Sequence, residues 1–383
     1  MNKETQKQKI CFVFGTRPEI IKLSPVIKEC VKRKIDFITV HTGQHYSENM
    51  DKIFWEGLQL PKIDYNLEVG SANHGTQTAK MLVGIEDILI DEQPSIVVVQ
   101  GDTNSVLAGA VAAAKLHIPV AHVEAGLRSF DMSMPEEVNR ILAGSVATYH
   151  FAPTQGAKEN LLREGEDESS IFVVGNTIVD SVNENVVIAA EQSTVLNELF
   201  KIDTRYALVT VHRQENADVK ENLEQIIEAI KRVSKENDLK IVWPVHPRTK
   251  KQLETFGLLK DVKAIDGMHL IEPVGFFDML RLQKASAVVM TDSGGLQEES
   301  CILGVPCVTL RSNTERPETV DVGANILAGN KTADIVAAVK QMLSQDAKQD
   351  NPFGDGTSAK QIMDVLSSDK PRVKTRATSE QYA

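Results

Sequence analysis

The stretch that decides the fold runs from Ser95 to Gly126 and reads SIVVVQGDTNSVLAGAVAAAKLHIPVAHVEAG. It opens with an apolar run at Ser95–Val99 and closes with another at Pro119–Val123, both typical of buried strands. Between them, Ser105–Leu116 is rich in alanine, as expected for a helix that packs closely on a sheet. A strand, a helix and a second strand in this order predict a βαβ unit with parallel strands.

The same alternation extends in both directions from this unit. Towards the N-terminus we expect strands at Ile10–Phe14 and Ile35–Val40, and helices from Pro18, over Glu48–Gly57 and over Gly75–Asp91. Towards the C-terminus we expect strands at Ala207–Val211, Lys240–Pro244, Ala285–Met290 and Pro306–Leu310. Helices are expected between and after these strands, at Lys220–Lys235, Phe277–Lys284, Leu296–Leu303, Ala333–Leu343 and Ala359–Leu366.

The two series of strands predict two domains. Gln192–Arg205 is polar and has no strand pattern, so the boundary is expected there. We therefore predict an α/β protein with two doubly wound domains, at residues 1–190 and 191–366. Residues 367–383 form a polar tail that we expect to be disordered.

The composition excludes several classes of protein. Of 383 residues, 42% are hydrophobic and 25% are charged, which is typical of a globular protein. The net charge of −11 argues against nucleic acid or an acidic membrane as a partner, so any polyanion bound should be small. The four cysteines, Cys11, Cys30, Cys301 and Cys307, lie in apolar segments and are expected to be buried free thiols. Without a signal-like or membrane-spanning run, we expect a cytoplasmic protein.

Polar and charged residues gather where the predicted strands end. Ligands of open parallel sheets bind at the carboxyl ends of the strands, so we expect the active site there. Asp102 and Glu124 end adjacent apolar strands, and facing carboxylates raise each other's pKa, as a general acid or base requires. Glu136 opens a helix and is spaced to pair with Arg140, four residues later. His212 ends a buried strand and is followed by Arg213.

Two predicted helix starts suit a small anion. Ser293-Gly294-Gly295 precedes the helix expected from Leu296, and Gly15-Thr16 precedes the first helix, with Arg17 and Lys22 nearby. Free backbone N–H groups at such starts, with two cations, suit a diphosphate. No G-x-G-x-x-G follows a strand and no P-loop sequence is present, which disfavours NAD and a P-loop NTPase. No Cys/His cluster or D-x-D pair ends a strand, so no metal is expected.

Together these segments resemble the non-hydrolysing UDP-N-acetylglucosamine 2-epimerases. The matching segments run in the family's order: Gly15-Thr16-Arg17-Pro18-Glu19, Gln100-Gly101-Asp102-Thr103, His122-Val123-Glu124-Ala125-Gly126-Leu127-Arg128, Pro135-Glu136-Glu137 with Asn139-Arg140, His212-Arg213 with Glu215-Asn216, Asp292-Ser293-Gly294-Gly295 with Gln297-Glu298-Glu299, and Thr314-Glu315-Arg316-Pro317. The resemblance implies a GT-B fold, two Rossmann-like domains with the substrate in the cleft between them. It implies an isomerase that interconverts UDP-GlcNAc and UDP-ManNAc without metal or NAD, through UDP elimination to a 2-acetamidoglucal.

The resemblance also implies roles for single residues. The catalytic groups would be Asp102, Glu124 and Glu136, with His212 assisting. The substrate-binding set would be Arg17, Lys22, Arg140, Arg213, Val274, Met279, Ser293, Gly294, Gly295, Glu299 and Arg316, with Glu299 at the ribose hydroxyls. Bacterial relatives bind a second UDP-GlcNAc as an activator, and that region would map onto Gln44, His45, Arg213 and His246. Most relatives are homodimers, and the ManNAc unit would supply a surface glycan or polysaccharide.

Three alternatives remain open on sequence grounds. A hydrolysing epimerase would use the same carboxylates to direct water and release UDP. A GT-B glycosyltransferase would share the diphosphate site and need an acceptor. A nucleotide-sugar sensor would need the ligand site but neither Asp102 nor Glu124.

Overall fold

The βαβ unit predicted from residues 95–126 is present in the computed structural model, which describes residues 8–44, 55, 57–200, 204–345 and 351–368. Strand β4 (Ile96–Gln100) is followed by helix α4 (Asn104–Lys115) and strand β5 (Val120–Val123). The two strands pair in parallel, with Val97 opposite Val120. Close packing explains the small residues of α4, since a Cβ on Gly109 would lie 3.1 Å from side-chain carbons of Val13 and Val99.

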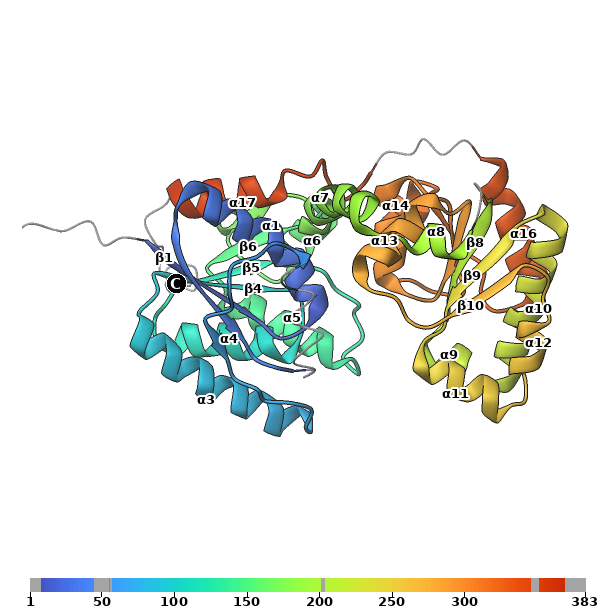
Figure 1. The fold of residues 1–383 in the computed structure, drawn as a ribbon. Coiled ribbons are helices and arrows are strands. Elements are labelled where there is room, and N and C mark those ends of the chain that lie inside the picture. Colours follow the sequence, from blue (N-terminus) through green and yellow to red (C-terminus); the bar gives the residue numbers. More distant parts are fainter. Residues whose placement is uncertain (1–7, 45–54, 56, 201–203, 346–350, 369–383) are drawn as a thin grey trace, which may run out of the picture. The chain divides into compact units, whose positions relative to one another are not determined.

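The first sheet has seven strands in the order β3-β2-β1-β4-β5-β6-β7. They are β1 (Lys9–Phe14), β2 (Asp36–His41), β3 (Tyr65–Asn66), β4, β5, β6 (Tyr149–Ala152) and β7 (Ile171–Val173), all paired in parallel. Figure 1 shows α1 (Arg17–Arg33) on one face of this sheet, with α3 (His74–Glu92), α4 and α5 (Pro135–Val146) on the other. Helix α6 (Gln155–Arg163) and a 3₁₀ turn at Glu168–Ser170 connect β6 to β7.

The second sheet has six parallel strands in the order β10-β9-β8-β11-β12-β13. They are β8 (Tyr206–Thr210), β9 (Lys240–Pro244), β10 (Met268–Ile271), β11 (Val288–Thr291), β12 (Cys307–Thr309) and β13 (Asn325–Leu327). Its helices are α8 (Val195–Leu199), α9 (Gln214–Ala217), α10 (Lys220–Asn237), α11 (Pro247–Thr255), α12 (Leu259–Lys263), α13 (Phe276–Ala285), α14 (Gly294–Leu303), α15 (Pro317–Asp321) and α16 (Thr332–Ser344). Trp243 of β9 is fully buried in the core between this sheet, α10 and α16.

The chain forms two units, and the second is inserted into the first. One unit comprises residues up to Ser181 and the described part of the chain from Phe353, and the other comprises Val182–Pro352. Helix α7 (Thr177–Gln192) spans the outward crossing, and α17 (Ser358–Ser368) follows the return. This division differs from the expected boundaries at 190 and 366.

Contacts of α17 explain the difference. Its Met363 lies beside Cys30 of α1, with 3.6 Å between the two sulfur atoms, and Asp364 pairs with Arg33 at 2.8 Å. The carboxyl group of Asp180 accepts hydrogen bonds from the backbone N–H groups of Ser358 and Ala359, the first two residues of α17. Periodicity predicts that α17 is amphipathic but cannot show which sheet its apolar face covers.

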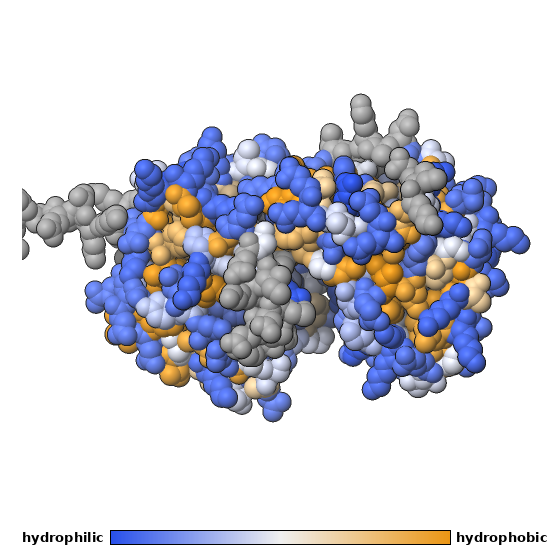
Figure 2. All heavy atoms as spheres, viewed as in Figure 1, coloured by the Kyte–Doolittle hydropathy of each residue, from blue (hydrophilic) through white to orange (hydrophobic). Residues whose placement is uncertain are grey.

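Further expectations concern the cysteines, membrane-spanning helices and the segments at residues 48–57 and 367–383. The four cysteines are buried free thiols, as predicted. The surface drawn in Figure 2 is mostly hydrophilic, with smaller hydrophobic areas. None of the helices in the described ranges combines the length and apolar character needed to cross a membrane. Most of the helix expected at residues 48–57, and the tail from residue 369, lie outside the described residues.

Candidate active site

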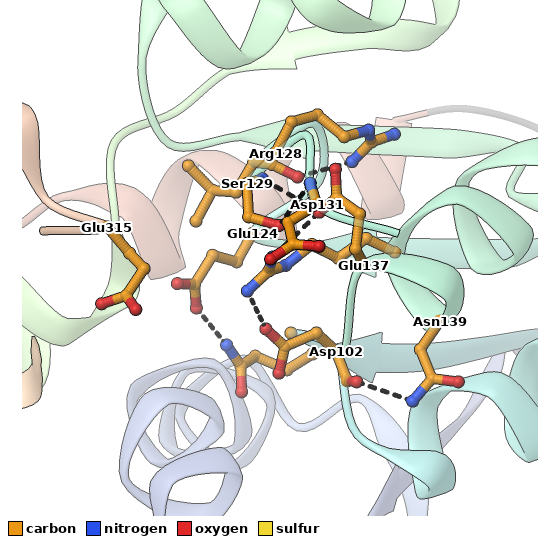
Figure 3. A network of polar contacts seen from close by, with 12 residues as sticks. Asp102, Glu124, Arg128, Ser129, Asp131, Glu137, Asn139 and Glu315 are labelled. Carbon is orange, nitrogen blue, oxygen red and sulfur yellow. Dashed lines mark hydrogen bonds and ion pairs between the residues drawn. The ribbon is translucent and has the colours of Figure 1, made fainter. Parts of the chain in front are cut away.

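Asp102 and Glu124 come from neighbouring strand ends of the first sheet (Figure 3). Gln100 at the end of β4 is opposite Val123 at the end of β5, and both loops then turn sharply. Gly101 has φ +83° and Glu124 has φ +65°. A left-handed backbone is unusual for a residue other than glycine and costs about 1–3 kcal/mol, so Glu124 is held in place by its surroundings.

Lys22 and Gln100 hold the carboxylate of Glu124. Lys22 Nζ lies 2.7 Å from Oε1 and 2.6 Å from Oε2 of Glu124. The side-chain amide of Gln100 donates a hydrogen bond to Oε2 of the same carboxylate. Glu124 is buried, and an opposite charge at this distance compensates the loss of hydration. Lys22, predicted to bind the substrate, thus also pairs with a predicted catalytic group.

Arg140 holds Asp102. Its guanidinium pairs with Oδ2 of Asp102 and, at 3.0 Å, with Glu137 (Figure 3). Burial raises the pKa of Asp102 and the Glu124 carboxylate raises it further, although Arg140 opposes both effects. The predicted interaction between the two carboxylates is therefore present at Asp102. The side chain of Asp102 stays 31% exposed, so a ligand can reach it.

Glu137, and not Glu136, is the buried carboxylate of α5. It accepts hydrogen bonds of 3.0 Å from the backbone N–H groups of both Ser129 and Phe130, and it pairs with Arg140. The predicted pairing of Glu136 with Arg140 is therefore wrong, because the spacing of three residues brings Glu137 to the arginine. Glu136 is exposed in the first turn of α5, and its catalytic role stays a prediction.

The carboxyl group of Glu19 lies at the start of α1 and contacts the residues that precede the helix. Glu19 accepts hydrogen bonds from the N–H of Gly15 at 3.0 Å and the hydroxyl of Thr16 at 2.8 Å. Burial raises the pKa of Glu19 to about 7, although its hydrogen bonds lower it. Glu19 thus engages the N–H of Gly15 and the hydroxyl of Thr16, and the anion site expected at this helix start stays a prediction. Arg17 is exposed at the first position of the helix.

A chain of side-chain amides leads from Gln44 to Asp102. The backbone carbonyl of Gln44 accepts from Gln77, whose Oε1 accepts from Asn104 at 2.8 Å. Asn139 donates to Oδ1 of Asn104 at 3.3 Å and to the backbone carbonyl of Asp102 at 2.9 Å. These buried amides fix the loop that carries Asp102. His45, grouped with Gln44 above, lies outside the described residues.

In the second unit, His212 and Asp292 follow the paired strands β8 and β11. The buried carboxylate of Asp292 accepts from the backbone N–H groups of His212 and Arg213, and from Asn216 at 3.2 Å. His212 Nδ1 lies 3.0 Å from Oδ1 of Asp292, which leaves Nε2 for a ligand. Burial opposes ionisation of Asp292, but bonds from His212, Arg213 and Asn216 outweigh it and lower its pKa. The part that Asp292 plays in orienting His212 was not predicted.

His246 lies beside His212, with ring centroids 5.6 Å apart. Its Nδ1 accepts a hydrogen bond of 3.2 Å from the backbone N–H of Arg248 and so caps α11. Burial lowers the pKa of His246, and the charges of His212 and Arg248 lower it further. A neutral ring with its proton on Nε2 suits this arrangement.

Helix α14 begins at Gly294, two residues earlier than predicted, with Ser293 at its N-cap. Gly294 and Gly295 therefore form the first helical turn, where backbone N–H groups have no partner within the helix. A Cβ on Gly294 would lie 3.6 Å from Glu315 Oε2, which places that carboxylate near the helix start. Arg311 pairs with Glu315 and Glu215, both at 3.1 Å, although the sequence patterns did not single it out.

The remaining predicted binding residues lie on α13 and α14 or shortly before α13 and α15. Nε of Arg316 is 3.0 Å from Oε1 of the buried Glu298 of α14. Glu299 is half-buried on the same helix, while Val274 is half-buried in the loop before α13 and Met279 is half-buried on it. Within the ranges that the structure describes, no group of three or more His, Cys, Asp and Glu side chains is placed to hold a metal ion.

A cavity of about 760 Å³ lies elsewhere in the second unit. Its lining includes Lys231, Leu239, Lys240, Asp261 and Ala264. Lys240 begins β9, so this cavity is at the amino end of a strand, opposite to His212 and Asp292. It has none of the predicted site residues in its lining.

These groups define what each unit can do chemically. The first presents two carboxylates, each backed by a cation, which suits proton transfer at carbon. The second presents a histidine oriented by an aspartate and the N-terminus of a ten-residue helix, which suit a phosphate group.

A sequence profile and individual relatives that resemble this chain all carry the description of a nucleotide-sugar 2-epimerase. The sequence profile described as UDP-N-acetylglucosamine 2-epimerase matches residues 28–367. The UDP-N-acetylglucosamine 2-epimerase of Methanocaldococcus jannaschii is 54% identical over 361 residues, which are 94% of this chain and 98% of the relative. UDP-2,3-diacetamido-2,3-dideoxy-D-glucuronate 2-epimerase of Pseudomonas aeruginosa is 41% identical over 360 residues, 94% of this chain and 99% of the relative.

A solved structure agrees. The M. jannaschii UDP-GlcNAc 2-epimerase in complex with UDP-GlcNAc and UDP superposes with a TM-score of 0.84 at 53% identity, over 94% of this chain and 99% of that one. This match and the two parallel sheets confirm the predicted α/β, GT-B-like fold class.

Proposed function

This chain belongs to the UDP-N-acetylglucosamine 2-epimerase family, and from this premise we propose that it interconverts UDP-GlcNAc and UDP-ManNAc. The observation that carries the proposal is the pair Asp102 and Glu124 at adjacent strand ends, with burial raising the pKa of Asp102. A carboxyl group with a raised pKa takes up a proton more readily than a free carboxyl group, as a general acid or base requires.

The proposed reaction proceeds by elimination and re-addition. The hydrogen at C2 of the sugar is not adjacent to a carbonyl group, so its direct removal is too difficult. Cleavage of the C1–O bond releases UDP with the bonding electrons, and a carboxylate takes the C2 proton, which leaves a C1=C2 double bond in 2-acetamidoglucal. A proton then adds to the opposite face of C2 and UDP returns to C1, so atoms and charges balance.

Asp102 and Glu124 are the proposed proton carriers. Each is paired with a cation, Arg140 and Lys22 respectively, and these cations set how readily the carboxylates change protonation state. Glu136 is proposed as a third acid/base group. Arg17 and Lys22 are the proposed cations of the first unit for the leaving diphosphate.

The second unit is proposed to hold the nucleotide. The diphosphate would accept hydrogen bonds from the first turn of α14 and from His212 Nε2, with Arg213 and Arg316 supplying positive charge. Glu299 would bind the ribose hydroxyls, and Val274 and Met279 would contact the base. Gln44, His45 and His246 are proposed for a second UDP-GlcNAc that activates the enzyme.

Incubation with UDP-GlcNAc in deuterated water tests the proposal. We expect deuterium at C2 and a mixture with UDP-ManNAc, and we expect Asp102→Asn and Glu124→Gln to lower the exchange rate by about 100-fold or more. Glu168→Gln, at an exposed carboxylate paired with Lys158, serves as the control and should exchange like the wild type. Retention of hydrogen at C2 throughout would exclude this function.

The same incubation separates the alternatives. Stoichiometric release of free UDP would indicate a hydrolysing epimerase, and turnover that requires an added acceptor would indicate a glycosyltransferase. Exchange only with the diacetamido-glucuronate analogue would favour the substrate named for the Pseudomonas relative.

We also propose a homodimer, which mass photometry would detect, and a supply of ManNAc units to a surface glycan.

A further inference from the structure

Glu19 makes one contact that its own helix does not need. At the start of α1, Oε2 of Glu19 accepts hydrogen bonds from the backbone N–H of Gly15 and from the hydroxyl of Thr16, the N-cap residue. The second oxygen of the carboxyl, Oε1, accepts a hydrogen bond of 2.8 Å from the hydroxyl of Thr103. Thr103 is 84 residues away and is the N-cap of α4.

This hydrogen bond connects the loop of Asp102 to the helix whose Lys22 holds Glu124. Thr103 follows Asp102 directly in the chain. Lys22 lies three residues beyond Glu19, about one turn further along α1, and its ammonium group holds Glu124. Glu19 is 2% exposed, so the bond to Thr103 forms away from water, where a hydrogen bond to a carboxyl group is stronger.

We propose that the Glu19–Thr103 hydrogen bond sets the separation of Asp102 and Glu124, and that Glu19 and Thr103 are positioning residues for the reaction. This inference rests on the proposed epimerase function. Loss of the bond would let α1 and its Lys22 move relative to the loop of Asp102, and the pull of Lys22 on the Glu124 carboxylate would shift with it. Proton transfer at C2 depends on placement to within about 1 Å, so the effect should fall on turnover and not on binding.

Thr103→Val tests this proposal, since it removes the hydroxyl at nearly constant volume and leaves the cap of α1 by Glu19 intact. We expect kcat for C2 exchange to fall by about 10- to 100-fold, with KM within about 2-fold of the wild type. Thr103→Ser keeps the hydroxyl and should restore kcat to within about 3-fold.

A matched control separates positioning from helix capping. Thr154 caps α6 in the same way as Thr103 caps α4. The hydroxyl of Thr154 accepts a hydrogen bond of 3.2 Å from the backbone N–H of Ala157, and the hydroxyl of Thr103 accepts one of 3.4 Å from that of Val106. Thr154→Val should lower the melting temperature about as much as Thr103→Val and leave kcat unchanged. Equal kcat in the two valine variants, or no recovery in Thr103→Ser, would overturn the proposal.

A direct measurement distinguishes failure of the inference from failure of the proposed function. The bond from Thr103 lowers the pKa of Glu19, so ¹³C NMR of the Glu19 carboxyl should show a higher pKa in Thr103→Val and no change in Thr154→Val. If the wild type shows no C2 exchange, the proposed function fails, whatever the NMR result. If the wild type exchanges and the Glu19 pKa does not move in Thr103→Val, the bond is absent and the inference alone fails.

Discussion

His122 lies two residues before Glu124 and belongs to the support of the site. Its Nε2 is 2.8 Å from the backbone carbonyl of Gly101, which precedes Asp102. The ring therefore ties the end of β5 to the loop after β4. Burial lowers the pKa of His122 to about 4, so the ring is neutral at physiological pH and donates from Nε2 to the carbonyl oxygen.

This histidine should make stability depend on pH. Between pH 6.5 and 4 the unfolded chain binds a proton at His122 and the folded chain does not, so stability is lost as the pH falls through this window. A shift of this size corresponds to about 3 kcal/mol. His122→Gln keeps a donor for Gly101 and cannot titrate there, so urea unfolding at pH 7 and pH 4.5 should show a smaller loss in the variant. An equal loss in both proteins would contradict the assignment.

Asp292 should be both a structural and an orienting residue. Asp292→Asn replaces one acceptor oxygen by an NH₂ group that faces the N–H groups of His212 and Arg213. We expect a loss of about 2–3 kcal/mol in urea unfolding, and weaker UDP binding because His212 is no longer oriented. Asp334→Asn, at an exposed position of α16, should change stability by less than about 0.5 kcal/mol.

Single residues also show where sequence reasoning succeeds and fails. Asp102, Glu124 and His212 follow strand ends as expected, because a polar residue directly after an apolar parallel strand lies at one edge of the sheet, and their roles stay predictions. Glu137 was missed because two adjacent glutamates at a helix start look equivalent until the preceding loop folds back and offers its N–H groups. Arg311 and Asp292 were missed as partners because their contacts join distant loops.

At the scale of elements, α1 and α14 begin in the same way but are used differently. Both follow a strand and have Thr16 or Ser293 at the N-cap. Glu19 bonds to the groups at the start of α1, whereas the first turn of α14 holds two glycines that leave its backbone accessible. The start of α14 is therefore the more accessible of the two, which supports its proposed role in binding the diphosphate.

Gly294→Ala tests this difference. The position lacks a positive φ, and the added Cβ would lie 3.6 Å from Glu315, an ordinary contact, so the helix should be unchanged or slightly more stable. We expect UDP affinity, measured by calorimetry, to fall by about 10-fold because the methyl group crowds the bound phosphate. Gly156→Ala, in the first turn of α6 and equally open, is the control and should leave UDP affinity unchanged.

The long helices were predicted closely, whereas several short strands were not predicted at all. The helices α3, α4, α10 and α16 lie within a few residues of their expected bounds, since long periodic segments need little tertiary help. Strands β6 and β7, with four and three residues, extend the sheet beyond β5 and were not predicted.

At the scale of the whole molecule, the insertion of one unit into the other makes α17 part of the first unit. Ile362 and Met363 of α17 are fully buried. The amphipathic pattern of this helix was visible in the sequence, but its partner, α1, is more than 300 residues earlier, as the 333-residue separation of Cys30 and Met363 shows.

Ile362→Ala should destabilise the first unit. Removal of a fully buried isoleucine side chain costs about 2–5 kcal/mol. Hydrogen exchange should show faster exchange in α1 and β1 and little change in β8 or β9. Met342→Ala, at a buried position of α16 in the second core, should give the reverse pattern. Uniform loss of protection in Ile362→Ala would show instead that the two units unfold together.

The return of α17 also sets an order for folding during synthesis. The ribosome completes β7 at Val173 and reaches Ser358 only after the entire second unit has been translated. At about 5–20 residues per second, the first sheet waits roughly 10–40 s for the helix that covers Cys30, while the second unit is contiguous and can fold as it emerges. The later half of the chain can therefore reach its native structure first, and the nascent protein exposes an apolar face of α1 in the meantime.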